Sequence, residues 1–134
     1  SQLATLIYQE GIFDCVEFLG TVADIDMYFS RLDIFALISK SEGFPTVVGQ
    51  AMLRGLPCVV SNVGDARILL SDPNQLVETE NIEHLVLALK FHLDSTRHNR
   101  IRLGNRNRQR IQNKFSRLRM LDRYDQLYNY VVND

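Results

Sequence analysis

Two short apolar runs, separated by a loop and a helical segment, restrict the folds open to this chain more than any other feature. The first run, DIFALIS, covers residues 33–39, and the second, CVVS, covers residues 58–61. Between them stand the loop KSEGFP and the helical stretch TVVGQAMLRG at residues 46–55. A nearly continuous apolar run is typical of a strand that is covered on both faces. The order strand, helix, strand therefore predicts a parallel sheet with right-handed crossovers.

The rest of the chain continues this alternation. Apolar residues at helical spacing predict a helix within residues 1–10 that stops at Gly11. The β-rich run CVEFLG predicts a further strand at residues 15–20. We expect the later elements to be a helix following an Asp24 cap, a short helix in 63–70, a strand at 75–79, and helices at 81–95, 97–115 and 116–132. The prediction is an α/β domain, an open parallel sheet with helices on both faces followed by C-terminal helices.

The helices at 81–95 and 116–132 each carry an apolar stripe. In the first, the residues expected to share a face are Ile82, Leu85, Val86, Leu89 and Leu93. In the second, with Ser116 as the expected N-cap, they are Leu118, Leu121, Tyr124, Leu127, Tyr128 and Val131. His84 and His92 lie on or beside the helix at 81–95, where a surface or boundary position is expected for both.

Composition describes an ordinary soluble domain. The chain has 134 residues, of which 46% are hydrophobic and 23% charged, enough for one domain with a real core. It contains no apolar run of 18 residues and no signal peptide pattern. Cys15 and Cys58 sit in apolar runs, which favours buried thiols in a reducing compartment. No His, Cys or Asp cluster has metal-ligand spacing, so neither a metal nor another cofactor is expected.

Charge is unevenly distributed along the chain. Residues 1–96 contain five basic and 13 acidic residues, whereas residues 97–134 contain ten basic and three acidic ones. Two interpretations of the basic segment at 97–123 stay open: a solvated helical face, or contact with an anionic membrane surface at the cytoplasmic leaflet. Binding to nucleic acid is not expected, because no aromatic pattern for base stacking accompanies the arginines and the body is acidic.

The loop after the first apolar run is the candidate site. Ligands of open parallel sheets bind beyond the carboxyl ends of the strands, which is where Glu42 and Gly43 follow. The helix after Pro45 begins with free amides at Thr46 and Val47, which favour a phosphate. The Glu42 carboxylate suits sugar hydroxyls instead. This site is expected to take a ligand with a phosphate and several hydroxyls, and Gln50, one turn along the helix, can reach the same cleft.

These residues carry a family resemblance. SKSEGFPTVVGQAMLRGLPCVV, residues 39–60, resembles the signature of nucleotide-sugar glycosyltransferases with two Rossmann-like domains, the GT-B fold, and in particular the retaining members known as glycosyl transferases group 1. VEFLG at 16–20, VGD at 63–65 and the closing aromatic pattern of 115–128 match in order and spacing. The resemblance covers nearly the whole chain.

The resemblance implies a domain assignment and a set of roles. Residues 1–134 would form a single domain, the Rossmann-like donor-binding half of the enzyme, without the N-terminal acceptor domain and without this domain's own first strand and helix. Glu42 matches the first acid of the family's acidic pair, which meets the donor sugar. Gly43, Phe44 and Pro45 match the loop whose backbone meets sugar hydroxyls. Thr46 and Val47 match the helix start that meets the diphosphate, and Gln50 matches the residue that holds the ribose. Thr21 and Val22 match the positions beside the nucleobase.

Two positions depart from the family pattern. Gln50 replaces the second acid, and Ile68 stands where many relatives carry Glu. The implied function of the full-length protein is transfer of a sugar from a nucleoside diphosphate sugar, with retention, in surface polysaccharide or glycolipid synthesis at the cytoplasmic side of the membrane. Two alternatives stay open: a non-catalytic nucleotide- or phosphate-binding module, and a membrane-associated interaction domain. The isolated fragment is expected to be inactive.

Overall fold

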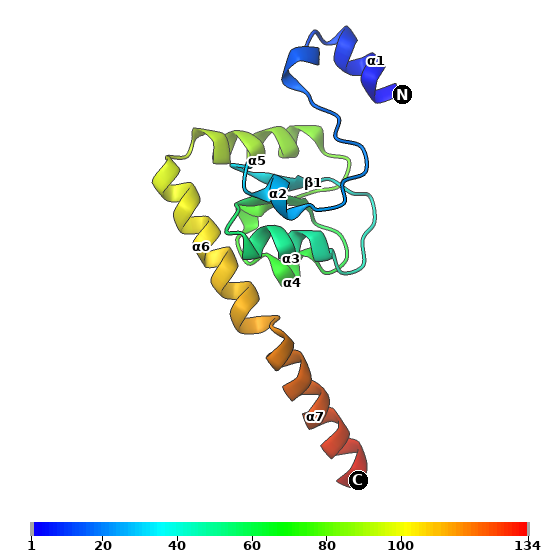
Figure 1. Cartoon of the computed structure of the whole chain (residues 1–134), viewed down its shortest axis with the longest axis vertical. Coiled ribbons are helices and arrows are strands. Elements are labelled where there is room, and N and C mark those ends of the chain that lie inside the picture. The colour runs from blue at the N-terminus through cyan, green and yellow to red at the C-terminus, as the bar shows by residue number, and fades with distance from the viewer. Residues whose placement is uncertain (1, 134) are drawn as a thin grey trace.

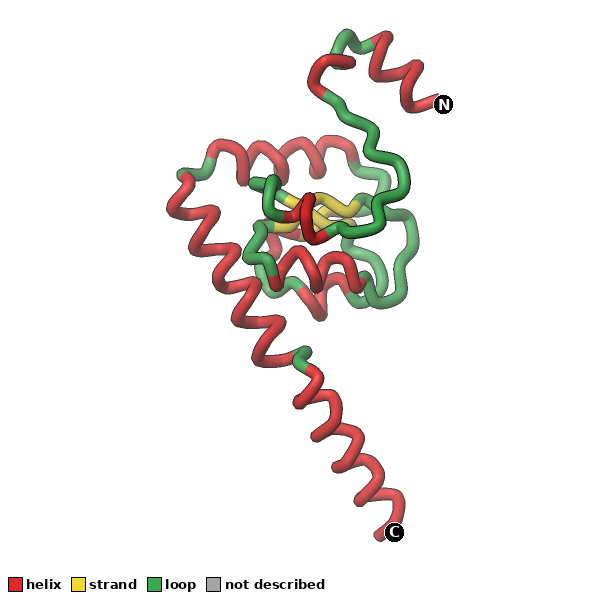
Figure 2. Tube along the Cα trace, viewed as in Figure 1, coloured by secondary structure: helices red, strands yellow, loops and turns green. Residues whose placement is uncertain are grey.

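The computed structural model describes residues 2–133 and consists of a small α/β body with a helical segment extending from each end (Figures 1 and 2). Its centre is a three-stranded parallel sheet in the order β1-β2-β3. The strands are Phe35–Leu37, Cys58–Ser61 and Leu76–Val77. The open parallel sheet predicted from the sequence is confirmed.

Helices occupy the connections between the strands and both ends of the chain. In chain order they are α1 (Gln2–Gln9), α2 (Asp26–Phe29), α3 (Thr46–Leu53), α4 (Ala66–Leu69), α5 (Ile82–Asp94), α6 (Arg97–Lys114) and α7 (Arg117–Asn133), with 3-10 turns at Phe13–Cys15 and Pro73–Gln75. Ser116 caps α7 as expected, because its hydroxyl accepts a hydrogen bond from the Arg119 amide. The predicted Asp24 cap lies one residue too early: Ile25 immediately precedes α2 without a side-chain cap, although the Asp24 side chain accepts a hydrogen bond from the Asp26 amide.

The two faces of the sheet are covered by different helices (Figure 1). Every residue of β2 is buried, and its side chains alternate between the faces. Cys58 and Val60 join the main core with residues of α3, α4 and α6. Val59 points the other way and packs with Val77 and with Ala88 of α5. Helices therefore lie on both faces of the sheet, as the sequence predicts.

The first predicted strand is shorter and less covered than expected. Only Phe35–Leu37 is a strand, and Ala36 at its centre is exposed. The reason is that β1 is an edge strand of the sheet, so that part of its outer surface has no covering helix. Its inward side is well packed, with the Phe35 ring edge-on to the Phe29 ring at 5.7 Å between centroids.

The strand predicted at residues 15–20 is wrong. Cys15 ends a 3-10 turn, and residues 16–20 form an extended linker with exposed side chains (Figure 2). A β-rich run becomes a strand only when another strand offers its backbone, and no strand of residues 2–133 pairs with this one. Cys15 is accordingly exposed, contrary to prediction, whereas Cys58 is buried. Burial raises the pKa of the Cys58 thiol to about 12, which keeps it protonated.

Helix α5 forms as predicted but buries a different stripe. Ile82, Val86 and Leu93 are exposed, while Ala88 and His92 are buried. The prediction of a surface or boundary position for His92 is therefore wrong, whereas His84 is half-buried beside the Glu78 amide. The His92 ring lies 3.2 Å from the Asn74 carbonyl oxygen through Nε2, and desolvation lowers its pKa despite that hydrogen bond. Two residues of the predicted stripe, Leu85 and Leu89, do pack against the core formed by Val59, Val77 and Ala88.

Helix α6 is fastened to the body along its length. A Cβ built on Gly104 would overlap the carbonyl oxygen of Gly55, which follows α3, so the two backbones are in close contact there. The buried Asn107 amide donates to the Leu56 carbonyl oxygen at 2.9 Å. Its side chain also pairs with that of Gln75, whose Oε1 accepts from the Cys58 amide at 2.9 Å. This buried network joins α6 to the start of the central strand.

Three arginines of α6 hold the ends of three other helices. Arg108 donates to the carbonyl oxygens of residues 53 and 54 at the end of α3, each at 2.9 Å. Arg110 donates to those of residues 68 and 69 at the end of α4, at 2.7 and 2.5 Å. Arg100 donates to those of residues 92, 93 and 95 at the end of α5. The unpaired carbonyls and the negative end of each helix dipole are thereby satisfied.

Helix α7 differs from every other long helix in its exposure. It extends away from the body (Figure 1), and its apolar side chains are exposed, from 45% for Leu121 to 80% for Val132. The apolar stripe predicted for this helix exists, but no other element of residues 2–133 buries it. None of the helices in the described residues is long and apolar enough to cross a bilayer.

Candidate functional site

The loop after β1 lies against the loop after β2. The Asp65 amide donates to the Gly43 carbonyl oxygen at 3.0 Å. Gly64 has a φ of +52°, and a Cβ at that position would overlap the carbonyl oxygens of both Glu42 and Gly43. Only glycine tolerates both this backbone angle and this contact. The turn at residues 63–65 therefore holds the backbone of the Glu42 loop in place at the carboxyl edge of the sheet.

Short polar contacts hold the Glu42 side chain. The Ser39 hydroxyl donates to Glu42 Oε1 at 2.8 Å, and the Ser39 amide donates to the Oγ of Ser61, a buried residue at the end of β2. The Glu42 side chain is half-buried, and its second oxygen remains available for further donors. The carboxylate is thus oriented by the ends of two neighbouring strands. No sequence signal points to Ser61, because its contact with Ser39 depends on the pairing of β1 with β2.

The first residues of α3 follow directly from the Glu42 loop. No side chain caps this helix, and the residue before it, Pro45, is buried and has no amide hydrogen to donate. The first intrahelical hydrogen bond is donated by Val48, to the Pro45 carbonyl oxygen at 3.0 Å. The amides of Thr46 and Val47 precede it and lie among the four that a helix leaves unpaired. Such a helix start favours an anion.

The side chains of these residues face different ways. Thr46 and Gln50 are exposed and one turn apart on α3, so they lie on the same face of the helix. Val47 packs against the main core, so that only its backbone is available to a ligand. The Phe44 ring lies 6.1 Å from the ring of Phe115, on the side of α7.

The other predicted residues do not join this cluster. Val22 lines a separate groove with Gly20, Tyr28 and Phe35, and Thr21 beside it is exposed. No hydrogen bond among residues 2–133 links either residue to the Glu42 loop. Lys40, the one cation of the loop, pairs with Glu80 at 2.6 Å on the exposed surface. Of the predicted residues, Glu42 and Gly43 thus lead directly into the start of α3, the helix that carries Gln50, whereas Thr21 and Val22 lie elsewhere.

The described residues contain no cluster of side chains suited to binding a metal ion. No group of three or more His, Cys, Asp or Glu side chains within residues 2–133 is placed to hold a metal ion. The expectation that the site works without a metal or other cofactor remains a prediction.

Comparisons with known proteins agree with this architecture. A family model described as "Glycosyl transferases group 1" matches residues 1–95. The chain is 32% identical over 118 residues to a UDP-Gal:alpha-D-GlcNAc-diphosphoundecaprenol alpha-1,3-galactosyltransferase of Escherichia coli, covering 86% of this chain and 30% of that protein. It is 24% identical over 132 residues to an O-antigen biosynthesis glycosyltransferase of Escherichia coli, covering 98% of this chain and 36% of that protein.

Solved structures show the same fold. A sucrose-phosphate synthase from Thermosynechococcus elongatus superposes with a TM-score of 0.84 and 25% identity, over 98% of this chain and 34% of that one. The C-terminal domain of a group 1 family glycosyl transferase from Francisella tularensis gives a TM-score of 0.77 at 21% identity, over 87% of this chain and 62% of that one. The chain spans about a third of the length of the two Escherichia coli relatives.

Proposed function

Because the chain belongs to the glycosyl transferases group 1 family, we propose that residues 1–134 are the donor half of a glycosyltransferase. The whole protein would transfer a sugar from a nucleoside diphosphate sugar to an acceptor in surface polysaccharide or glycolipid synthesis. The acceptor would be bound mainly by an N-terminal domain. One observation carries the proposal: the Gly64 turn packs against the backbone of Glu42 and Gly43, in the loop that leads into the uncapped start of α3.

The two halves of the site suit the two halves of such a donor. The Glu42 carboxylate accepts hydrogen bonds from sugar hydroxyls, while Ser39 keeps it oriented. The Thr46 and Val47 amides face the diphosphate, where negative charge grows as the leaving group departs. The Gln50 amide bonds to ribose hydroxyls. Fixed backbone dipoles stabilise that charge without reorganising during the reaction.

The reaction that follows from this arrangement breaks the bond between the sugar's anomeric carbon and the diphosphate. The transition state at that carbon is oxocarbenium-like, and Glu42 holds the sugar in position rather than attacking it. Retention of the anomeric configuration is part of the proposal and rests on the likeness of residues 39–60 to retaining enzymes. Nothing in this arrangement requires a metal, so donor binding is expected to be unchanged by EDTA.

A binding panel tests the donor site. UDP, GDP and ADP, each with and without a sugar, are titrated into the chain by calorimetry. One nucleotide sugar should bind more tightly than its bare nucleotide, and Glu42→Ala should reduce that difference by about tenfold, the loss of one or two charge-assisted hydrogen bonds. Glu83→Ala, an exposed acid on α5, is the matched control. An unchanged difference in Glu42→Ala refutes the role given to this carboxylate.

The non-catalytic alternative has its own supporting observation. Gln50 is neutral, and Ile68 is exposed on α4 with its carbonyl oxygen already bonded to Arg110. A degenerate module would bind nucleotides without discriminating the sugar. Gln50→Glu in the full-length protein separates the two: a rise in turnover supports the enzyme, and a protein that binds nucleotide but transfers no sugar in either form supports the module.

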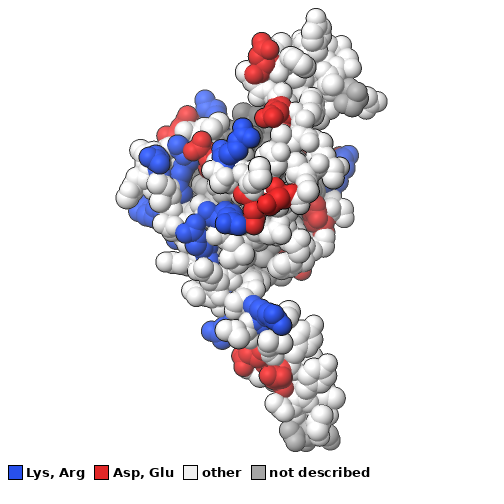
Figure 3. Space-filling model, in the orientation of Figure 1, with Lys and Arg blue, Asp and Glu red and all other residues white. Residues whose placement is uncertain are grey.

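A place at the cytoplasmic face of the membrane is the remaining part of the proposal. Within the basic segment 97–123, the side chains of Arg100, Arg108 and Arg110 are engaged with helix ends, and Arg106 pairs with Asp72 at 2.9 Å. These four are poorly placed to serve lipid. Figure 3 shows further cations where α6 meets α7, with acids nearby. Contact with anionic lipid would depend on the cations of that junction.

A further inference from the structure

Glu80 has a backbone conformation that is unusual for its residue type. It lies between β3 and α5 with a φ of +59°, and it is the one non-glycine residue within 2–133 whose φ is positive. A left-handed backbone costs free energy in any residue that carries a Cβ, and glycine adopts it without that cost. Strain kept at a position where glycine would relieve it indicates that the side chain is used.

The Glu80 carboxylate reaches the Glu42 loop. Its Oε1 lies 2.6 Å from Nζ of Lys40, which follows β1. Because β2 separates β1 from β3 in the sheet, this ion pair joins the loops that follow the two outer strands. The turn that carries Glu80 is itself fastened to α5, since the Asn81 side chain accepts a hydrogen bond from the His84 amide at 2.9 Å.

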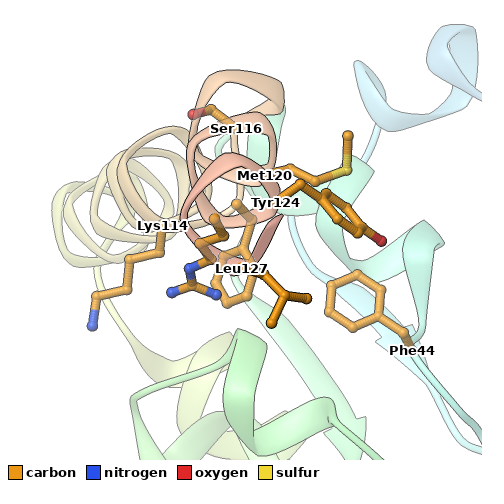
Figure 4. A pocket seen from close by; sticks show the side chains of 8 residues that line it. Phe44, Lys114, Ser116, Met120, Tyr124 and Leu127 are labelled. Atoms are coloured by element: carbon orange, nitrogen blue, oxygen red, sulfur yellow. The ribbon is translucent and has the colours of Figure 1, made fainter. Parts of the chain in front are cut away.

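Lys40 is the one cation of the Glu42 loop and stands two residues before Glu42. The Ser39 hydroxyl already donates to Glu42 Oε1 at 2.8 Å, and the other carboxylate oxygen has no hydrogen-bond partner among residues 2–133. Phe44, on the other side of Gly43, extends toward Leu127 of α7 (Figure 4). Within this loop, Lys40 is therefore the side chain able to neutralise Glu42, because its flexible stem carries the ammonium to any acid within reach.

We propose that Glu80 is a specificity-determining residue: by pairing with Lys40, it keeps that ammonium away from the Glu42 carboxylate, which stays free to accept hydroxyls of a donor sugar. This inference rests on the proposed function, in which Glu42 binds the sugar. Without Glu80, Lys40 pairs with Glu42, and the sugar has to displace it. Exposed ion pairs are weak, so the loss is at most about fivefold in the sugar preference, the ratio of the affinities for a nucleotide sugar and its bare nucleotide.

Two variants and their combination separate this role from a purely structural one. The sugar preference is measured by calorimetry, with urea denaturation as the check on folding. Glu80→Asn, which suits a left-handed backbone, should lower the sugar preference about threefold without lowering the urea midpoint. Lys40→Gln should leave the preference unchanged, and adding Lys40→Gln to Glu80→Asn should restore it. The matched control is Glu83→Asn, at an exposed acid on α5, which should change neither quantity.

A measurement without ligand keeps the test independent of the proposed function. The carbon-13 signal of the Glu42 carboxylate should move in Glu80→Asn and return to the parent position in the double variant. If no nucleotide sugar binds, the proposed function fails, and this signal still decides the inference. An unmoved Glu42 signal, or an unchanged sugar preference in Glu80→Asn, overturns the inference. A loss in Lys40→Gln as large as that in Glu80→Asn overturns it too, because the ion pair would then act only as a clasp between the two loops.

Discussion

Helices α6 and α7 both carry arginines but use them differently in the structure. They follow one another with only residues 115 and 116 between them. Helix α6 has seven basic residues and no acid, whereas α7 has three basic residues, two acids and an apolar stripe. Along α6, Arg100, Arg108 and Arg110 donate to the ends of three other helices, and Gly104 brings the backbone against that of Gly55. Along α7, the arginines have no such acceptors within residues 2–133, and the apolar side chains are exposed.

This contrast between α6 and α7 shows that the structural role of an arginine depends on which hydrogen-bond acceptors lie within its reach. A basic run in a sequence cannot distinguish a solvated cation from one that ends a neighbouring helix, because the acceptors are backbone carbonyls with no side-chain signature. In α6 the cations belong to the fold. In α7 the arginine side chains of the described residues hold no helix end. Substitutions in the two helices should therefore have unequal effects on stability.

The largest effect is expected at the α6–α3 contact. Gly104→Ala would press a methyl group into the Gly55 carbonyl, and both backbones would have to separate, so we expect a loss of about 3 kcal/mol or more in the free energy of unfolding. Urea denaturation measures it. Asn105→Ala, at an exposed position one residue on, should change stability by less than about 0.5 kcal/mol. Equal effects of the two would show that α6 is not closely packed.

A smaller loss is expected in the buried network. Asn107→Ala leaves the Gln75 amide and the Leu56 carbonyl oxygen without their partner, which should cost about 2 kcal/mol. The comparison variant is Asn113→Ala, an exposed asparagine on the same helix. If both variants unfold at the same urea concentration, the network does not hold α6 in place.

Next in size is the contrast between one arginine on each helix. Arg110→Ala removes the donor to the end of α4 and should cost about 1 kcal/mol, whereas Arg119→Ala on α7 should stay within about 0.5 kcal/mol of the parent. Thermal unfolding of both variants checks the difference. A loss from Arg119→Ala as large as that from Arg110→Ala would contradict the division drawn between the helices.

The smallest effect is a pH dependence at the corner of α5 and α6. The His92 ring lies near the Asn74 carbonyl oxygen and Asp72. Arg100 donates a hydrogen bond to the backbone carbonyl oxygen of His92. Since desolvation lowers its pKa in the folded state, the unfolded chain binds the proton more readily. Stability should be full above the ordinary pKa of 6.5 and fall as pH drops through the lower folded-state pKa. His92→Gln should flatten this slope between about pH 7 and 5, and His98→Gln, an exposed position, should not.

Much of the fold could be predicted because local signals agreed with the final packing. The helix at 46–55 had a proline before its start and a glycine at its end, and CVVS was apolar on both faces, so both elements formed where expected. The run at 15–20 failed because a strand needs a partner that its own sequence does not supply. The buried stripe of α5 was misplaced because His92 gains a carbonyl partner that only the folded chain provides.

In the candidate site, too, the features set by consecutive residues could be predicted and those set by strand pairing could not. Glu42, Gly43 and the start of α3 could be located from the strand, loop and helix order, because those elements are consecutive. Ser61 and the reason for Gly64 could not, since both depend on the second strand lying beside the first. The contact between Phe44 and Phe115 was equally hidden, because the two residues lie more than seventy positions apart in the chain.

The claim on which the rest depends is that the Glu42 loop and the start of α3 bind a nucleotide sugar together. Amide chemical shifts of the chain, titrated with the tightest nucleotide sugar and then with its bare nucleotide, test it directly. We expect Thr46 and Val47 to respond to both ligands, and Glu42 and Gly43 to respond strongly only when the sugar is present. Shifts that leave all four amides unmoved, or that gather around Val22 and Tyr28 alone, would contradict it.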